Sequence, residues 1–278
     1  MVVQHNLQAM NANRQLGITT TQQGKSTEKL SSGYRVNRAA DDAAGLSVSE
    51  KMRRQIRGLD QASANAQDGV SLVQSAEGAL NEVHDMLQRM NELTVKAANG
   101  TYTTTQKQYI ADEINQLISE IDRIATTTKF NDQSVLNGSG ANAKSFSFQV
   151  GNESGETMSV AISKMTATKL ATNLKNQSWS AATQYSAVAS FITVISSALE
   201  KVASQRSALG AVQNRLEHTI NNLDNIVENT TAAESRIRDT DMAKSMVSYS
   251  NNQILAQAGQ AMLAQANQSN QGVLSLLQ

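Results

Sequence analysis

The stretch from Leu46 to Asn99 constrains the fold of this chain more than any other. It contains no proline, and its apolar residues recur at steps of three and four, which places them on one face of a helix and is typical of a coiled-coil seam. At about 1.5 Å per residue, such a helix extends over roughly 80 Å. A compact globule of this chain length needs no helix that long. The seam residues are Met52, Ile56, Leu59, Ala66, Val70, Val73, Leu80 and Leu87.

A second apolar stripe begins beside this seam at Leu80. It continues through Val83, Leu87 and Met90. A straight helix drifts relative to a strict seven-residue repeat. We therefore expect the buried seam to shift near Leu80, with a change or a rotation of the packing partner.

The composition agrees with a chain made mostly of long helices. At an average of about 5% proline, a chain of this length would hold roughly fourteen prolines, and it holds none in 278 residues. Aromatic residues make up 4%, which argues against a thick globular core because large rings supply much of the buried area there. There are 24 basic and 24 acidic residues, so the net charge offers no general attraction to nucleic acid or to an anionic membrane.

Other classes of site are excluded by the residues that the chain lacks. It contains no cysteine, which rules out disulfides and thiolate metal sites. The N-terminus shows no basic leader followed by an apolar core, and no apolar run approaches the roughly eighteen residues of a membrane-spanning helix. We expect neither membrane insertion nor a cleaved signal peptide.

Two more heptad stripes and one alternating region predict the elements that pack on the long helix. After a reversal at Asn99 and Gly100, one stripe contains Ile110, Ile114, Leu117, Ile121 and Ile124. The other contains Ile195, Leu199, Val202, Leu209, Leu216, Ile220, Leu223 and Val227. Between them, alternating apolar residues on both sides of a Gly-rich turn predict a β-hairpin near residues 140–165. The expected fold is mainly α, a long antiparallel coiled-coil helical bundle rod with a small β-hairpin region.

Both termini carry helices with thin apolar stripes. Val3, Leu7 and Met10 begin the first of them. The last is rich in alanine and follows Asp239 or Asp241, either of which can cap its N-terminus. Such stripes are too sparse to hold an isolated helix. We expect the terminal helices to order only against another element.

Several short motifs resemble bacterial flagellin. The segments Lys29–Gly33, Asp41–Gly45, Gly58–Ser63 and Glu77–Glu82 look like its N-terminal signature, in the same order. Three blocks near the end look like its C-terminal signature: Ser235–Asp241, Ile254–Gly259 and Leu263–Gln268. The resemblance covers roughly residues 1–165 and 190–278.

The resemblance implies a structural subunit that polymerises into the flagellar filament for motility. Residues 1–40 with 235–278 would form an inner filament domain whose helices order on polymerisation. Residues 41–165 with 190–234 would form the helical rod domain, and 166–189 a short variable connection. The residues expected to make polymerisation contacts are Val3, Leu7, Met10, Ile254, Met262, Leu263, Val273, Leu274 and Leu277.

The same resemblance implies where the chain acts and what it meets. It would be secreted through the flagellar export apparatus into an extracellular filament. Its partners would be further copies of itself, an export chaperone, and the cap and junction proteins of the flagellum, with no cofactor.

One segment is similar to the flagellin motif read by the vertebrate Toll-like receptor for flagellin. It spans Leu87–Leu93, and the receptor-binding hypothesis covers Gln88, Arg89, Leu93 and Glu113. An arginine beside an apolar anchor is typical of interface hot spots. The alternative is that these residues pack neighbouring subunits in a filament.

Enzymatic and metal-binding functions find little support in the sequence. His5, His84 and His218 lie on separate predicted helices, without the i, i+4 pair or HExxH spacing of a zinc site, and we expect them to be exposed to solvent. The basic residues Lys51, Arg53, Arg54 and Arg57 predict a solvated or subunit-bridging face. The remaining alternatives are a hook–filament junction protein, which shares the terminal helices, and a module devoted to binding a host receptor.

Overall fold

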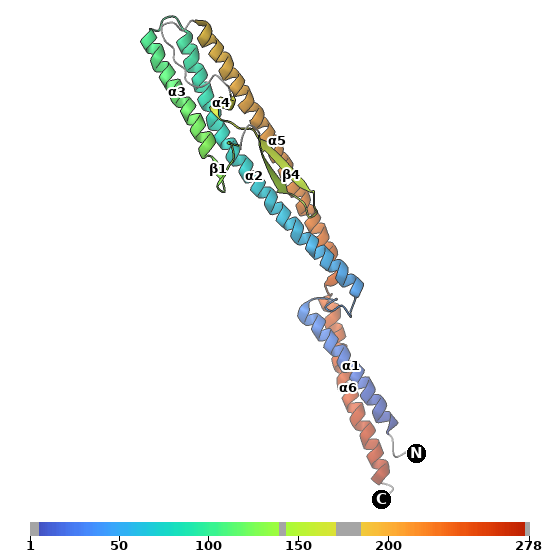
Figure 1. The fold of residues 1–278 in the computed structure, drawn as a ribbon. Helices are drawn as coiled ribbons and strands as arrows, with labels where there is room; N and C mark the ends of the chain where they lie inside the picture. The colour runs from blue at the N-terminus through green and yellow to red at the C-terminus, as the bar shows by residue number, and fades with distance from the viewer. Residues whose placement is uncertain (1–5, 139–142, 171–184, 276–278) are drawn as a thin grey trace. The chain divides into compact units, whose positions relative to one another are not determined.

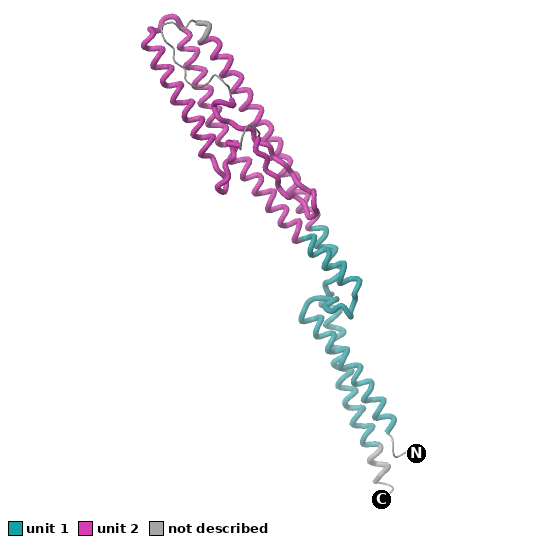
Figure 2. The backbone as a smooth tube through the Cα atoms, viewed as in Figure 1, with its two compact units in different colours: residues 1–56, 228–278 teal, residues 57–227 magenta. Residues whose placement is uncertain are grey.

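The computed structural model describes residues 6–138, 143–170 and 185–275, and within these ranges the chain is mainly helical, as predicted (Figure 1). The chain divides into two compact units (Figure 2). Unit 1 contains residues 1–56 and 228–278, and unit 2 contains residues 57–227. Unit 1 is therefore built from the two ends of the sequence, whereas unit 2 is one continuous segment.

Helix α2 (Ala43–Ala98) is uninterrupted over 56 residues and confirms the predicted long helix. Within unit 2, two series of buried positions recur along it at intervals of seven. The first series is Leu59, Ala66, Val73, Leu80, Leu87 and Thr94. The second series is Ala62, Gly69, Ala76, Val83, Met90 and Ala97. This double repeat is the pattern of a coiled-coil seam.

The predicted shift of the seam near Leu80 is wrong. The buried face runs unbroken through Leu80, because small residues occupy the second series before that point and the bulkier Val83 and Met90 follow directly after it. The size of the side chains changes along α2, while the face that is buried stays the same. Val70, predicted as a seam residue, is only half-buried.

Helix α5 (Tyr185–Arg238) confirms the predicted third helix. Six of its buried positions also recur every seven residues: Val188, Ile195, Val202, Leu209, Leu216 and Leu223. Leu199, Ile220 and Val227 are half-buried. In unit 2 the seams of α2 and α5 contribute to shared apolar clusters: Leu80 and Leu209 lie in one, and Ala66 and Leu216 lie in another.

Helix α3 (Thr104–Thr127) begins at a capping box formed by Thr103 and Gln106. Three residues of its predicted stripe are buried (Ile110, Ile114 and Ile121), whereas Leu117 and Ile124 are half-buried. Ala111, Ile118 and Ala125 are buried as well. The buried face is wider than a two-helix seam because α3 also meets α4 (Ala167–Leu170), whose first N–H donates to Asp122 at 2.8 Å.

The predicted β-hairpin is confirmed. Strands β3 (Lys144–Gln149) and β4 (Thr157–Ile162) pair antiparallel, with Phe146 opposite Val160. The buried face of β4 consists of Met158, Val160 and Ile162. At Gly69, an added Cβ would lie 3.3 Å from Leu216 and 3.4 Å from Phe148, so the hairpin, α2 and α5 meet closely there.

A second, shorter hairpin was not predicted. It pairs β1 (Lys129–Phe130) with β2 (Gln133–Ser134) around Asn131 and Asp132, which have φ angles of 48° and 61°. Asn and Asp tolerate these left-handed angles, and two such residues between strands are the known signal for a tight hairpin. The sequence pattern does not reveal these strands, because each contains only two residues. Most of the predicted connection at 166–189 lies outside the described residues.

In unit 1, α1 (Leu7–Ser32) lies along α6 (Met242–Ser275). Asn6 caps α1 by accepting from the Ala9 N–H at 3.0 Å, and its amide donates to the Ala266 carbonyl of α6 at 3.0 Å. Gly33 ends α1 at a φ of 75°. Of the two predicted caps for α6, Asp241 has this role, since its carboxylate accepts from the Lys244 N–H at 3.0 Å.

The segments that follow α1 and α5 pair with each other in unit 1. Tyr34 and Asp239 form an antiparallel bridge. On either side of it, the Arg35 N–H donates to the Arg238 carbonyl at 2.6 Å, and the Thr240 N–H donates to the Gly33 carbonyl at 3.0 Å. We call this pairing the clasp. It holds the C-terminal end of α1 beside the N-terminal end of α6.

Candidate assembly surface

Helices α1 and α6 expose most of their apolar side chains. No described side chain of α1 is buried, and in α6 only Ala256 is buried among those described. Leu7 is 67% exposed and Ile254 is 63% exposed. Contiguous exposed apolar surface on a soluble chain marks a site of interaction. The pair therefore presents a surface suited to cover by another protein surface.

The contacts between α1 and α6 explain why these side chains stay outside. Near the middle of the pair, an added Cβ on Gly259 would lie 3.3 Å from Leu16, so the helices approach closely at a glycine. Elsewhere they meet through polar groups, as where the Asn252 amide donates to the Ser26 hydroxyl at 3.4 Å. Small and polar residues thus take part in the contact between α1 and α6 together with half-buried Leu16, while most of the larger apolar residues remain exposed.

The predicted polymerisation residues fall into three groups. Leu7, Met10, Ile254 and Met262 are exposed, and Leu263 is half-buried. Val273 and Leu274 belong to α6, but their side chains are not among those that the structure describes. Val3 and Leu277 lie outside the described residues. Five exposed apolar residues of the same helices were not predicted as contacts: Ile18, Met242, Met246, Val247 and Leu255. A signal for them existed, because each is a large apolar residue in a helix with no dense stripe.

The residues of the receptor-binding hypothesis come together on α2 and α3 in unit 2. The guanidinium of Arg89 donates to Glu113 at 3.0 and 3.2 Å and to Glu92 at 3.3 Å. The hydrogen bond to Glu113 is the main reason that the pKa of Arg89 is raised above its ordinary value. Gln88 is exposed and its amide lies 2.9 Å from the His84 ring. Leu93 is only 3% exposed and packs in the core. Its side chain supports this surface from below.

The described histidines do not form a catalytic or metal-binding cluster. His218 is exposed as predicted, but His84 is half-buried, because its ring lies beside Gln88. His5 lies outside the described residues. In the described part of the chain, no group of three His, Asp or Glu side chains is arranged to hold a metal ion. None of the helices in that part combines the length and the apolar character needed to cross a membrane.

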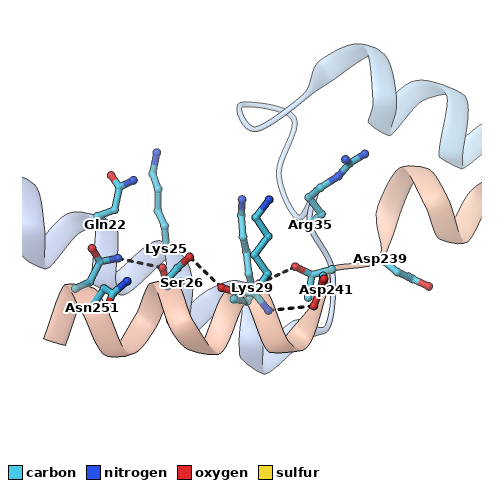
Figure 3. A pocket seen from close by; sticks show the side chains of 13 residues that line it. Gln22, Lys25, Ser26, Lys29, Arg35, Asp239, Asp241 and Asn251 are labelled. Atoms are coloured by element: carbon cyan, nitrogen blue, oxygen red, sulfur yellow. Dashed lines mark hydrogen bonds between the residues drawn. The ribbon is translucent and has the colours of Figure 1, made fainter. Parts of the chain in front are cut away.

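A polar groove of about 720 Å³ lies between α1 and α6 next to the clasp (Figure 3). Its cationic side chains are Lys25, Lys29, Arg35 and Lys244, and its carboxylates are Asp239 and Asp241. Figure 3 shows the side chains of Lys25 and Arg35 pointing to the same side. Sequence analysis did not predict this groove, because Lys244 lies more than two hundred residues from Lys25 and Lys29.

Comparison with known proteins shows which protein families the chain is similar to. Residues 3–141 match the family described as the bacterial flagellin N-terminal helical region, and residues 192–277 match the bacterial flagellin C-terminal helical region. The chain is 53% identical over 277 residues to a flagellin of Halalkalibacterium halodurans and 49% identical over 305 aligned positions to a flagellin of Bacillus subtilis. It is 47% identical to the flagellar filament 31.3 kDa core protein of Treponema maltophilum. All three alignments cover both proteins completely.

Among solved structures, a Vibrio parahaemolyticus chain assigned as a flagellar hook-associated protein is similar with a TM-score of 0.60. The match covers 72% of this chain and 100% of that one at 15% identity, so it supports the fold alone. The full-length identity to flagellins is far higher than this. The two family regions together cover most of the sequence and confirm the resemblance seen in its motifs. The chain therefore belongs to the bacterial flagellin family.

Proposed function

We propose that unit 1 of this flagellin, a structural subunit of the bacterial flagellar filament, carries the contacts that join subunits. One observation carries the proposal: α1 and α6 hold several large apolar side chains that remain exposed in the described chain. Full burial of one such side chain contributes about 1.5–3 kcal/mol. A handful of them is enough to favour a polymer over free subunits.

We infer that contacts between unlike surfaces of successive copies extend the assembly into an open polymer. A contact between unlike surfaces on successive copies does not pair off as a symmetric dimer does, and it extends into a helical filament if the rotation between copies does not close a ring. Among the described side chains of the α1–α6 pair only Ala256 is buried, so we infer that the stability of the pair depends on cover from neighbours. We therefore assign the ordering of the terminal helices to assembly, as a case of folding coupled to binding.

Further partners follow from membership of the family. Export through the flagellar secretion apparatus to an extracellular filament, and contacts with an export chaperone and with cap and junction proteins, belong to this proposal. A junction protein is the weaker alternative, since the hook-associated neighbour shares only 15% of its sequence with this chain. Recognition by the Toll-like receptor for flagellin is a second candidate function, favoured by the exposed Arg89–Glu113 pair.

Seeded polymerisation tests the assembly proposal. Purified monomer is added to short filament fragments, and growth is followed by light scattering and electron microscopy. We expect the full chain to extend the seeds into tubes of uniform width. A variant that lacks residues 235–278, and with them α6, should not extend them. Equal growth by both proteins, or persistently monomeric full-length protein, would refute the role of unit 1.

A matched pair of point variants separates the surface from the fold. Ile254→Ser removes an exposed apolar group from α6, while Ser248→Ala changes an exposed position of the same helix that carries no large apolar group. Both variants should keep the helical content of the monomer, because neither side chain is buried. Only the first should slow elongation.

A further inference from the structure

The charges of this chain are separated between its two units. The whole sequence is neutral. Unit 1 carries 11 Lys and Arg against 8 Asp and Glu, whereas unit 2 carries 13 against 16, so the units have net charges of +3 and −3. In a homopolymer every copy supplies both signs. Contacts between unlike units of successive copies are then favoured by charge.

The positive charge of unit 1 has a focus in the groove beside the clasp. Lys25, Lys29 and Lys244 line it, and none of them has an ion pair with any described residue. The two carboxylates of the groove are already engaged: Asp241 accepts from the N–H of Lys244, and Asp239 accepts from the Ser235 hydroxyl at 2.7 Å. The three ammonium groups therefore line an open groove without an ion pair to a described residue. The charges of Lys25 and Lys29 also add to the lowering of the pKa of Asp41 that its backbone hydrogen bonds cause, so that carboxylate lies within their electrostatic reach. Figure 3 shows the side chains of Lys25 and Lys29 in this groove.

The negative charge of unit 2 is concentrated on α2. Residues 58–88 contain no lysine or arginine. Four acidic residues on this part of the helix are exposed and have no hydrogen bond or ion pair within the described chain: Asp60, Asp68, Glu82 and Asp85. At 100° per residue these four positions fall within about 100° of one another around the helix, so they share one face. Glu77, which lies off this face, is engaged by Arg206 at 3.7 Å.

The spacing of these groups selects a pair on each side. Lys25 and Lys29 stand four apart on α1, and Glu82 and Asp85 stand three apart on α2, so each pair occupies neighbouring positions on a helix surface, roughly 5–6 Å between Cβ atoms. Asp60 and Asp68 stand eight apart, at about 12 Å along the axis. Only the Glu82–Asp85 pair in this face matches the spacing of the lysines.

We propose that the groove formed by Lys25, Lys29 and Lys244 receives Glu82 and Asp85 from α2 of a second copy of this chain. The contact joins unlike surfaces, as an open helical polymer requires, and it rests on the proposed function of unit 1 in assembly. The apolar side chains of α1 and α6 contribute most of the affinity. The charged contact sets which part of the neighbour meets the groove and speeds the encounter.

Charge reversal in seeded elongation tests this contact. The first variant is Lys25→Glu with Lys29→Glu, the second is Glu82→Lys with Asp85→Lys, and the third combines all four substitutions in one chain. The matched control is Asp60→Lys with Asp68→Lys, which reverses the same number of charges on the same face at the wrong spacing. Each protein grows on seeds of its own kind at low ionic strength, and circular dichroism checks the fold of each monomer.

Each double reversal of the first two kinds should slow elongation about tenfold, since it replaces attraction by repulsion. The combined variant should recover to within a few fold of the natural chain, and the control should stay close to it. The proposal would be overturned if the combined variant were slowed by the product of the two factors measured for the separate double variants. It would also be overturned if the control were slowed as much as either of those variants. If the natural chain itself fails to elongate, the failure belongs to the assembly function rather than to this contact.

Discussion

The guanidinium of Arg238 stacks over the ring of Tyr34, 4.5 Å from its centre. The same guanidinium donates to Glu50 at 3.1 Å, and the side chain of Arg238 is only 13% exposed. Its backbone carbonyl accepts the Arg35 N–H inside the clasp. One residue at the end of α5 thus contacts the segment after α1 and the first turns of α2, and the geometry of unit 1 depends on it.

Replacing Arg238 by Met tests that dependence. The variant keeps an apolar stem but loses the stacking on Tyr34 and the ion pair with Glu50. Stacking of a cation on a ring contributes about 0.5–2 kcal/mol, and the pair with half-exposed Glu50 adds little. We expect faster amide exchange in α1 and in the first turns of α6. Arg236→Met is the control, because the Arg236 side chain is exposed and only its carbonyl is used. Equal exchange in the two variants would contradict the role of the clasp.

Gly69 and Gly78 offer a second matched pair, both within α2. At Gly69 a side chain would meet Leu216 and Phe148, whereas at Gly78 nothing lies within 4 Å. Gly69→Leu should destabilise unit 2 by about 1–3 kcal/mol or more, because it overpacks a close contact. Gly78→Leu should leave stability unchanged or raise it by up to about 1 kcal/mol through helix propensity. Denaturant unfolding of the two variants measures the difference, and a stable Gly69→Leu protein would disprove the close approach.

Gly69 also shows which parts of the fold could be predicted from the sequence and which could not. Long helices and the larger hairpin were predictable because heptad and alternating patterns of bulky residues extend over many positions. The continuity of the seam in α2 was not, because Ala62, Gly69 and Ala76 carry no hydrophobic signal that separates core from surface. Burial at these positions depends on how closely α5 and the hairpin approach, which is a property of the packed structure.

The candidate sites, too, could be predicted from the sequence only in part. Sparse stripes at the termini predicted helices that order only against another element, and in the structure α1 lies along α6 with Leu7 and Ile254 exposed. The groove could not be predicted, since no local pattern relates Lys25 to Lys244. Leu93 was expected to take part in a surface site, but it is buried in the core of unit 2. In a helix, residues three or four apart share a face while residues one or two apart point to different faces, so a contiguous motif mixes exposed and buried positions.

The carboxylate of Asp41 makes the stability of unit 1 depend on pH. It accepts from the N–H groups of Arg38 at 3.1 Å and of Asn37 at 3.3 Å, and these bonds lower its pKa below the ordinary value of 3.8. A group whose pKa is depressed by folding contributes stability that is present above its ordinary pKa and is lost as the pH falls through its folded pKa. The contribution of Asp41 is therefore complete at neutral pH and disappears below pH 3.8.

Asp41→Asn should accordingly lower the melting temperature at pH 7, and the gap to the natural chain should narrow as the pH falls below 3.8. Thermal unfolding monitored over a series of pH values measures this. Asp132→Asn is the control, since Asp132 lies in the turn of the short hairpin of unit 2 and its carboxylate has no hydrogen bond within the described chain. A gap that stays constant with pH would show that Asp41 acts through its shape rather than its charge.

Arg89 and Arg123 are both exposed arginines paired with a glutamate, and they separate receptor recognition from general charge effects. Arg89 is held by Glu113 and Glu92 within the segment that resembles the receptor motif, whereas Arg123 is paired with Glu120 elsewhere in unit 2. If the exposed pair forms the receptor surface, Arg89→Ala should weaken binding to the receptor ectodomain by about tenfold or more, as expected for a hot-spot arginine.

Arg123→Ala should leave that affinity unchanged, and neither variant should alter the unfolding midpoint by much, because exposed ion pairs contribute about 0–1 kcal/mol. Leu93→Ala behaves differently: it should destabilise unit 2 by about 2–5 kcal/mol, since it empties a buried position. A loss of receptor binding by Leu93→Ala is therefore evidence for a direct contact only after the folded fraction of that variant has been measured. Surface plasmon resonance with monomeric protein gives the affinities. If Arg89→Ala and Arg123→Ala bind equally well, the segment serves the packing of subunits and the receptor hypothesis falls.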